Sequence, residues 1–317
     1  MHLLAVGTHS SARADAKMTQ TALRVKTLLL VAGWARGVLA RGKTLATAAV
    51  IGAICLWAGP AAPAQLWLDP SDASRAALGP DEAAGAVIWS HGRSVDSEDS
   101  RAPTPPYLAA LRDGGWDTFR FNRMRASDTL SASARALLDD VHQLKQRGYR
   151  RVALAGQSFG AFLSLMAADA SEEVDAVVAT APAAYGSFAE FYDSWRSNAT
   201  ELYPLLEQVR RARVMIFYFH GDDFDPGGRG DRSRDILAAR KLPHVVVDQP
   251  ARLTSHWAAA TPQFARAFGG CILGFLDAAQ VADGAQCDGQ GLWAGTPAMK
   301  TAQPNRVTDP SDKSNGG

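Results

Sequence analysis

The strongest constraint on the fold is an alternation of short apolar segments with longer helical segments. Six of the short segments are rich in β-branched or aromatic residues, and most of them are apolar without a break. Strands buried on both faces of a parallel sheet have this composition. The predicted strands are residues 86–89, 116–121, 151–155, 174–180, 214–219 and 244–248.

Helical segments lie between these predicted strands. In the clearest one, residues 131–147, Leu137, Val141 and Leu144 recur at helical spacing, and Gly148 follows as a stop signal. Strands that alternate with helices predict an α/β fold with a mostly parallel, doubly wound sheet of about six strands, covered by helices on both faces. The other predicted helices are residues 105–111, 161–168, 230–240 and 262–278.

One long connection interrupts this alternation. Residues 183–211 are rich in aromatic side chains and predict one or two helices, as a lid over a site or as a long crossover. These aromatic side chains suggest an apolar wall, although packing into the core would give the same composition.

The first 64 residues predict a secretory signal peptide. An uncharged apolar run at residues 44–58 follows Arg36, Arg41 and Lys43, and residues 62–64 (APA) fit a cleavage site before Gln65. The alternative is an uncleaved anchor, since residues 28–39 add a second apolar stretch. We therefore expect a periplasmic or extracellular protein with no stable membrane span after cleavage.

Removal of the leader changes the charge of the chain. The whole chain has 33 basic and 32 acidic residues and a net charge of +1, of which residues 1–64 contribute seven positive charges and one negative. The remainder therefore has a net charge of −5, which argues against a nucleic-acid partner. Residues 65–288 predict one α/β domain, and residues 289–317 predict a disordered tail.

Cysteine usage leaves two interpretations open. Cys55 would leave with the leader, and Cys271 and Cys287 would remain as a pair in an oxidising compartment. They form either a disulfide or one buried and one exposed thiol.

The segment with the clearest chemistry follows the predicted strand 151–155. Residues 156–160 (GQSFG) match G-x-S-x-G between a strand and an apolar helix. In that context the turn is sharp, its neighbours must be small, and Ser158 stands at the end of the strand as a nucleophile. The N–H of Phe159 is then a donor for a developing oxyanion. The loop after strand 86–89 predicts the second donor, the N–H of Arg93, beside Gly92.

A serine nucleophile needs a base and a residue that orients the base. Among the histidines after Ser158, His256 lies in the loop between the last predicted strand and the last helix, so we expect it to be the base. The acid should follow strand 214–219, where three carboxylates crowd together. We favour Asp222, which is nearest the strand end, with Asp225 and then Asp223 as alternatives.

The chain resembles the α/β-hydrolase superfamily, and within it the compact dienelactone-hydrolase-like and prolyl-oligopeptidase-like serine esterases. The resemblance covers roughly residues 84–280 and implies the same nucleophile, base and oxyanion donors. One departure is Phe224, at the position where such proteins often place the acid. The residues that support the resemblance are His91-Gly92, the GQSFG segment, His220-Gly221-Asp222 and Ser255-His256.

These features predict a secreted serine hydrolase that cleaves a small carboxylic ester and needs no cofactor and no metal. The alternatives are a peptidase or acyltransferase with the same triad, or a non-catalytic binding protein on a hydrolase fold. The sequence leaves the oligomeric state open. Two further interpretations concern single segments: the arginines at 229, 232 and 234 suggest a solvated face, and residues 198–200 (NAT) match a glycosylation sequon.

Overall fold

The computed structural model describes residues 67–93, 100–123, 128–282, 284–288 and 291–293. The predicted leader and almost all of the predicted tail lie outside the described residues. Within the described part, no helix has the length and apolarity that a membrane crossing requires.

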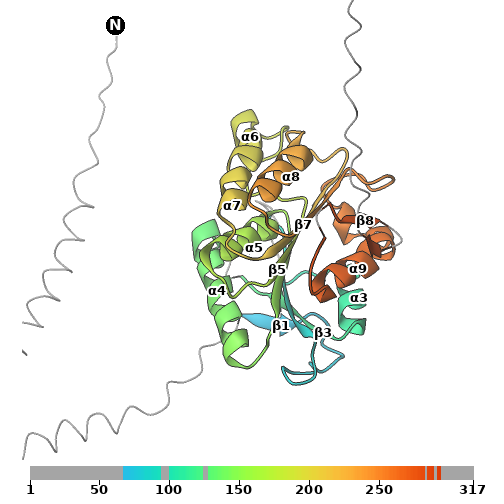
Figure 1. Cartoon of the computed structure of the whole chain (residues 1–317). Helices are drawn as coiled ribbons and strands as arrows, with labels where there is room; N and C mark the ends of the chain where they lie inside the picture. The colour runs from blue at the N-terminus through green and yellow to red at the C-terminus, as the bar shows by residue number, and fades with distance from the viewer. Residues whose placement is uncertain (1–66, 94–99, 124–127, 283, 289–290, 294–317) are drawn as a thin grey trace, which may run out of the picture. The chain divides into compact units, whose positions relative to one another are not determined.

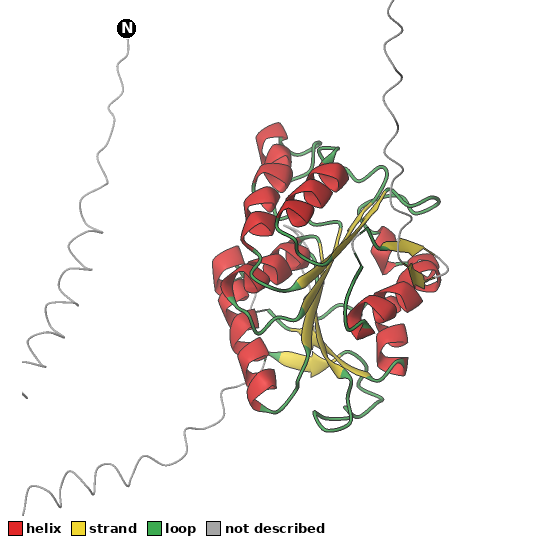
Figure 2. Ribbon diagram, in the orientation of Figure 1, coloured by secondary structure: helices red, strands yellow, loops and turns green. Residues whose placement is uncertain are grey.

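A twisted sheet forms the centre of the described domain (Figure 2). Within the described residues it has seven strands in the order β1-β3-β2-β4-β5-β6-β7. Neighbouring strands are parallel except for the pair β1 and β3. The strands are β1 (Leu68–Pro70), β2 (Gly85–Ser90), β3 (Trp116–Phe121), β4 (Val152–Gln157), β5 (Ala176–Thr180), β6 (Arg213–Tyr218) and β7 (His244–Asp248).

This topology confirms the predicted α/β class and its mostly parallel sheet. The sheet has one strand more than the six predicted, because β1 pairs antiparallel with β3 at one edge, with Leu68 opposite Phe121. A strand of three residues is too short to leave a hydrophobic pattern, which explains why the sequence did not indicate it.

Helices cover both faces of the sheet (Figure 1). The helices α3 (Tyr107–Asp113) and α9 (Pro262–Asp277) lie together on one face. On the other face lie α4 (Leu130–Gln146), α5 (Phe159–Ala170), α7 (Leu202–Gln208) and α8 (Arg229–Ala239). The long connection 183–211 contains two helices, α6 (Tyr192–Thr200) and α7, as predicted.

Successive residues of the central strands face opposite hydrophobic cores. In β4, Val152 and Leu154 contribute to the core beneath α4 and α5, whereas Ala153 and Ala155 contribute to the core beneath α3 and α9. Both sides of the strand are therefore apolar, because side chains alternate across a strand and helices cover each face. The central sheet is thus a buried platform whose carboxyl edge can position functional groups.

A disulfide joins Cys271 in α9 to Cys287 in β8 (Gln286–Asp288), with 5.8 Å between their Cα atoms. This observation decides between the two interpretations of the cysteine pair. The strand β8 pairs antiparallel with β9 (Gly291–Trp293), so the disulfide attaches this C-terminal hairpin to α9.

Candidate active site

Ser158 occupies the tight turn between β4 and α5. Its backbone angles, φ 57° and ψ −118°, lie in a region that costs a non-glycine residue about 1–3 kcal/mol. A Cβ on Gly156 would overlap the backbone of Gly160, and a Cβ on Gly160 would overlap the carbonyl of Ser90. The turn therefore closes only with glycine at both positions, which is the physical content of the G-x-S-x-G segment.

The predicted acid and the predicted base are brought together where the chain that follows β7 returns to the side of the chain that follows β6. β6 and β7 are in register from Val214 opposite His244, and pairing resumes in an isolated bridge between His220 and Thr254. Two residues beyond each bridged residue lie Asp222 and His256. The connection after β7 thus makes an excursion that returns the chain to the side of β6, and this return sets the acid against the base.

Asp222 accepts a hydrogen bond of 2.9 Å from Nδ1 of His256. Both side chains are buried, and the N–H of Phe224 donates to the same carboxylate oxygen at 2.9 Å. A carboxylate that holds Nδ1–H leaves Nε2 as the acceptor nitrogen of the neutral imidazole. This is the arrangement that a general base requires.

The two alternative carboxylates have other partners. Asp225 forms an ion pair of 2.7 Å with Arg229, and Asp223 accepts a long hydrogen bond of 3.4 Å from the N–H of Ala189. Of the three crowded acids, Asp222 is the one that contacts His256. The geometry therefore favours the first of the three candidates.

The hydroxyl of Ser158 donates to the carbonyl of Ala183, at 3.1 Å, and among the described residues this is its hydrogen-bond acceptor. The N–H of Ser158 donates to the carbonyl of Thr180, at the end of β5. A rotation about χ1 moves a serine hydroxyl between staggered positions. Ser158, the predicted nucleophile, is thus held at the carboxyl edge of the sheet, with its hydroxyl turned to the main chain that follows β5.

Aromatic rings surround the imidazole of His256. The ring of Phe224 lies 4.3 Å from it, centroid to centroid, at 33°, and the ring of Trp257 lies 5.4 Å away at 82°. Phe224 is the residue that departs from the usual acid position of the resembled family. Here it packs against His256 and donates its N–H to Asp222, two contacts that the sequence alone did not indicate.

The two predicted oxyanion donors come from adjoining backbone segments. Phe159 is the first residue of α5, and the first N–H groups of an α-helix have no partner within the helix. Gly92 approaches the nucleophile closely, because a Cβ built on it would lie 3.3 Å from the Cβ of Ser158. Arg93 follows directly, so the structure places both predicted donor residues beside Ser158.

Three buried polar side chains near this site are functional candidates that sequence reasoning missed or misassigned. Arg229 is fully buried and donates to the carbonyl of Pro182, so the prediction of a solvated face is wrong at this position. Asn198 is also fully buried. Its Oδ1 accepts hydrogen bonds from the N–H groups of Ala184 and Tyr185, and its Nδ2 donates to two main-chain carbonyls. The asparagine of the predicted sequon is therefore inaccessible in the folded domain.

The third is Arg123, two residues beyond the end of β3. Its guanidinium contacts the main chain of residues 91–92 and the carboxylate of Asp128. An arginine shortly after a strand is an ordinary sequence feature. Only the tertiary contacts distinguish this arginine from its neighbours.

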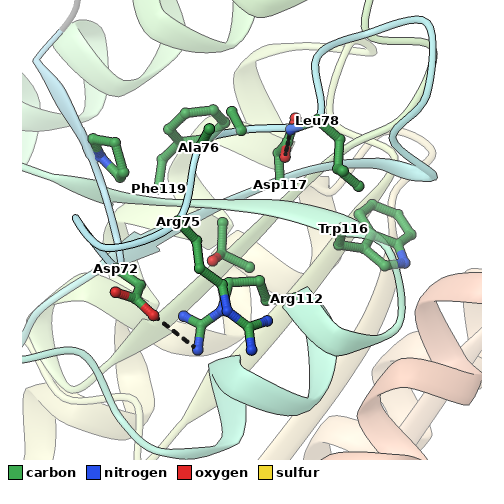
Figure 3. Close-up of a pocket in the computed structure, with 11 residues that line it drawn as sticks. Asp72, Arg75, Ala76, Leu78, Arg112, Trp116, Asp117 and Phe119 are labelled. Atoms are coloured by element: carbon green, nitrogen blue, oxygen red, sulfur yellow. Dashed lines mark hydrogen bonds and ion pairs between the residues drawn. The ribbon is translucent and has the colours of Figure 1, made fainter.

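A separate cavity of about 110 Å³ lies between β3 and the segment that follows β1 (Figure 3). Its arginines are paired, Arg112 with Asp72 at 3.3 Å and Arg75 with Asp113 at 2.7 Å. Trp116, one of its lining residues, starts β3, whereas Ser158 follows the end of β4. The cavity is therefore not part of the candidate site. No group of three or more metal-binding side chains occurs among the residues described.

The sheet order, its single antiparallel edge strand and the turn at Ser158 decide the architecture. The fold is the α/β-hydrolase fold. A dienelactone hydrolase from Anabaena variabilis ATCC 29413 is similar over 59% of this chain and 82% of that chain, with 18% identity and a TM-score of 0.41. A truncated carbohydrate esterase from gut microbiota is similar over 62% and 85%, with 12% identity and a TM-score of 0.47.

A puromycin-hydrolyzing peptidase from Mycobacterium tuberculosis is similar over 66% of this chain and 37% of that chain, with 15% identity and a TM-score of 0.44. No family model matches the chain, and no curated protein matches it. Values this low do not specify a reaction for this chain.

Proposed function

We propose that this α/β-hydrolase-fold protein is a serine hydrolase that cleaves a carboxylic ester. The observation that supports it most directly is the buried hydrogen bond of 2.9 Å between Asp222 and His256, at the sheet edge where Ser158 sits in its strained turn. Gln157, directly before Ser158, donates from Nε2 to the carbonyl of His256 at 3.2 Å, which links the strained turn to the segment of the imidazole. Backbone strain of this kind persists only where the surrounding structure enforces it, and it is concentrated at functional sites.

In the proposed reaction, the hydroxyl of Ser158 rotates from the carbonyl of Ala183 to Nε2 of His256 and attacks the ester carbonyl carbon. His256 takes the hydroxyl proton and delivers it to the leaving alcohol. Water then attacks the acyl-enzyme, with His256 again as the base, and releases the acid. Asp222 holds the imidazole and stabilises its charged form throughout.

The N–H groups of Phe159 and Arg93 are proposed to bind the oxyanion of each tetrahedral intermediate. Donors that are already in place before the reaction stabilise the developing charge without reorganising, and one such donor is worth about 10²–10³ in rate. Both donors belong to segments that close packing holds beside the nucleophile.

Exposed aromatic side chains support an apolar substrate. Phe188, Phe191 and Tyr192 are more than half exposed, and so is Trp257 beside the base. The N–H of Phe188 donates to the carbonyl of Asp223, next to the proposed acid, so this aromatic segment adjoins the site. Of the two interpretations of the aromatic connection, an apolar wall therefore fits these three residues better than core packing.

We also propose that the protein is exported. The disulfide between Cys271 and Cys287 supports this, because disulfides form and persist in oxidising compartments. The leader that would direct export lies outside the described residues. The proposal of export therefore rests on the sequence pattern of the leader and on this disulfide.

The decisive experiment is substitution of the nucleophile. We expect Ser158→Ala to keep the fold and to lower kcat on p-nitrophenyl esters by about 10⁴-fold or more, because the covalent route is lost. Labelling by a fluorophosphonate probe should disappear in the same variant. Ser171→Ala, at the other end of α5, is the matched control and should retain both activities.

A panel of p-nitrophenyl esters with acyl chains of increasing length, a peptide amide and an alcohol acceptor separates the alternatives. Preference for an ester with water as acceptor supports the proposal. Faster cleavage of the amide would indicate a peptidase, and transfer to the alcohol an acyltransferase. Absence of both turnover and labelling in the wild-type protein would contradict an enzymatic function.

A further inference from the structure

A buried arginine lies behind the loop that provides the second oxyanion donor. We call residues 91–93 the oxyanion loop. Arg123 donates from Nη1 to the carbonyl of His91 at 2.6 Å and from Nη2 to the carbonyl of Gly92 at 2.8 Å. Two neighbouring carbonyls of one loop thus share a single guanidinium.

The guanidinium is itself held in place. Its Nε donates to both carboxylate oxygens of Asp128, at 3.1 and 3.0 Å, and Asp128 also accepts from the hydroxyl of Ser133 at 2.7 Å. The side chains of Arg123 and Asp128 are 1% and 4% exposed. An ion pair this buried gains little net stability, because desolvation offsets the attraction. Stability alone therefore does not explain why this ion pair is buried behind the oxyanion loop.

The planarity of the peptide group links the contacts of Arg123 to the direction of the Arg93 N–H. In a trans peptide the C=O and the N–H of one unit point in opposite directions. The carbonyl of Gly92 and the N–H of Arg93 belong to the same unit, so a guanidinium that holds this carbonyl sets the direction of this N–H. The N–H of Arg93 therefore points away from Arg123. Gly92, in the same peptide unit, is close to the serine, because a Cβ built on Gly92 would lie 3.3 Å from the Cβ of Ser158.

The second predicted donor shares the same support. The ring of Phe159 lies 5.3 Å from the guanidinium carbon of Arg123 and 5.5 Å from that of Arg93. Contacts of this length between a cation and an aromatic face are attractive. Arg123 therefore contacts both the loop of one donor and the side chain of the residue that provides the other.

We propose that Arg123, oriented by Asp128, is the positioning residue of the oxyanion hole: it aligns the Arg93 N–H toward the reacting carbonyl. This inference rests on the proposed serine-hydrolase function. The role needs the planar fork of arginine, because two carbonyls and one carboxylate must be satisfied in one plane. Lysine supplies the charge but cannot reproduce that fork.

The test is Arg123→Lys with p-nitrophenyl butyrate. We expect kcat to fall by about 10²-fold or more while KM changes by less than about threefold, since an oxyanion donor acts in the transition state. Affinity for an alkylboronic acid, which forms a tetrahedral adduct with the serine, should fall with kcat. Arg120→Lys, three residues earlier in the chain and paired with Asp69, is the matched control and should behave as wild type.

Asp128→Asn provides a second variant that keeps the guanidinium and removes its charged partner, and it decides the matter if Arg123→Lys does not fold. We expect a smaller fall in kcat in the same direction, with boronate affinity again following kcat. A folded Arg123→Lys protein with kcat within twofold of wild type would overturn the inference. So would a fall in kcat without any loss of boronate affinity, which a general loosening of the site would produce.

The two levels of proposal fail differently. If the wild-type protein neither hydrolyses any ester of the panel nor reacts with fluorophosphonate, the serine-hydrolase function fails, and the inference falls with it. If the wild type is active and loses activity in Ser158→Ala but not in Arg123→Lys, the function stands and only the positioning role is wrong.

Discussion

At the scale of single residues, the site depends on side chains whose roles are separated by their partners rather than by their chemical type. Asp222, Asp223 and Asp225 are identical in chemistry and lie within four positions of the chain. One contacts the imidazole, one contacts the exposed segment 188–191, and one neutralises a fully buried guanidinium. The same substitution at each position should therefore produce a different defect.

We expect Asp222→Asn to lower kcat by about 10³–10⁴-fold with little loss of stability, because the amide cannot hold the required tautomer of His256. Asp225→Asn should instead lower the free energy of unfolding by about 3–5 kcal/mol, since it leaves the Arg229 charge unpaired. Asp223→Asn should change both quantities little. Ester kinetics and denaturant unfolding of the three variants check this, and equal losses of kcat would contradict the assignment of the acid.

At the scale of secondary structure elements, the helix α4 has a buried apolar stripe that contains one acidic residue. In α4, the residues Leu137, Val141 and Leu144 form the buried stripe. Asp140 lies in the same stripe and is fully buried. Its Oδ1 accepts from the N–H of Trp67 at 3.2 Å, and among the described residues its Oδ2 has no hydrogen-bond partner.

Burial raises the pKa of Asp140 from 3.8 to about 7. A carboxyl whose pKa is higher in the folded state binds its proton more tightly there, so the stability it supports is lost as the pH rises from about 4 to about 7. We expect Asp140→Asn, which stays neutral, to escape this loss. Above pH 7 it should be more stable than wild type by up to about 4 kcal/mol.

Urea unfolding of both proteins between pH 4 and pH 8 measures this difference. The exposed neighbour provides the control: Asp139→Asn should retain most of the pH dependence of the wild type. Stability curves of wild type and Asp140→Asn that run parallel across this range would contradict the prediction.

At the scale of the whole molecule, the disulfide and the predicted leader both favour export of the chain from the cytoplasm. When the chain is expressed with residues 1–64 in a bacterium that exports proteins, we expect it to be recovered outside the cytoplasm, starting at Gln65. Its mass should be lower by two hydrogens than that of the reduced form, because Cys271 and Cys287 are joined. N-terminal sequencing and mass spectrometry check both points. Recovery of the intact chain in the cytoplasm with free thiols would contradict export.

Much of the fold followed from local patterns. Residues 116–121 and 244–248 are strands with the predicted bounds, and the segment before Ser158 is a strand followed by a helix. For central strands such as β4 and β5 the reason is that a strand between two helical layers must be apolar on both sides. Likewise, a turn as tight as that at Ser158 admits only glycine at its two flanking positions.

Other features depended on the tertiary structure. The assignment of Asp222 to His256 follows from the excursion of the chain after β7, which no local pattern encodes. The burial of Arg229 and the contacts of Arg123 with the oxyanion loop join residues about 30 or more positions apart. The sequence by itself determined the layered α/β architecture and the tight turn at Ser158, because both depend on periodicity and on the space around a turn. The tertiary structure decided which acid faces the base and which arginine holds the loop, because both depend on which distant backbone atoms meet.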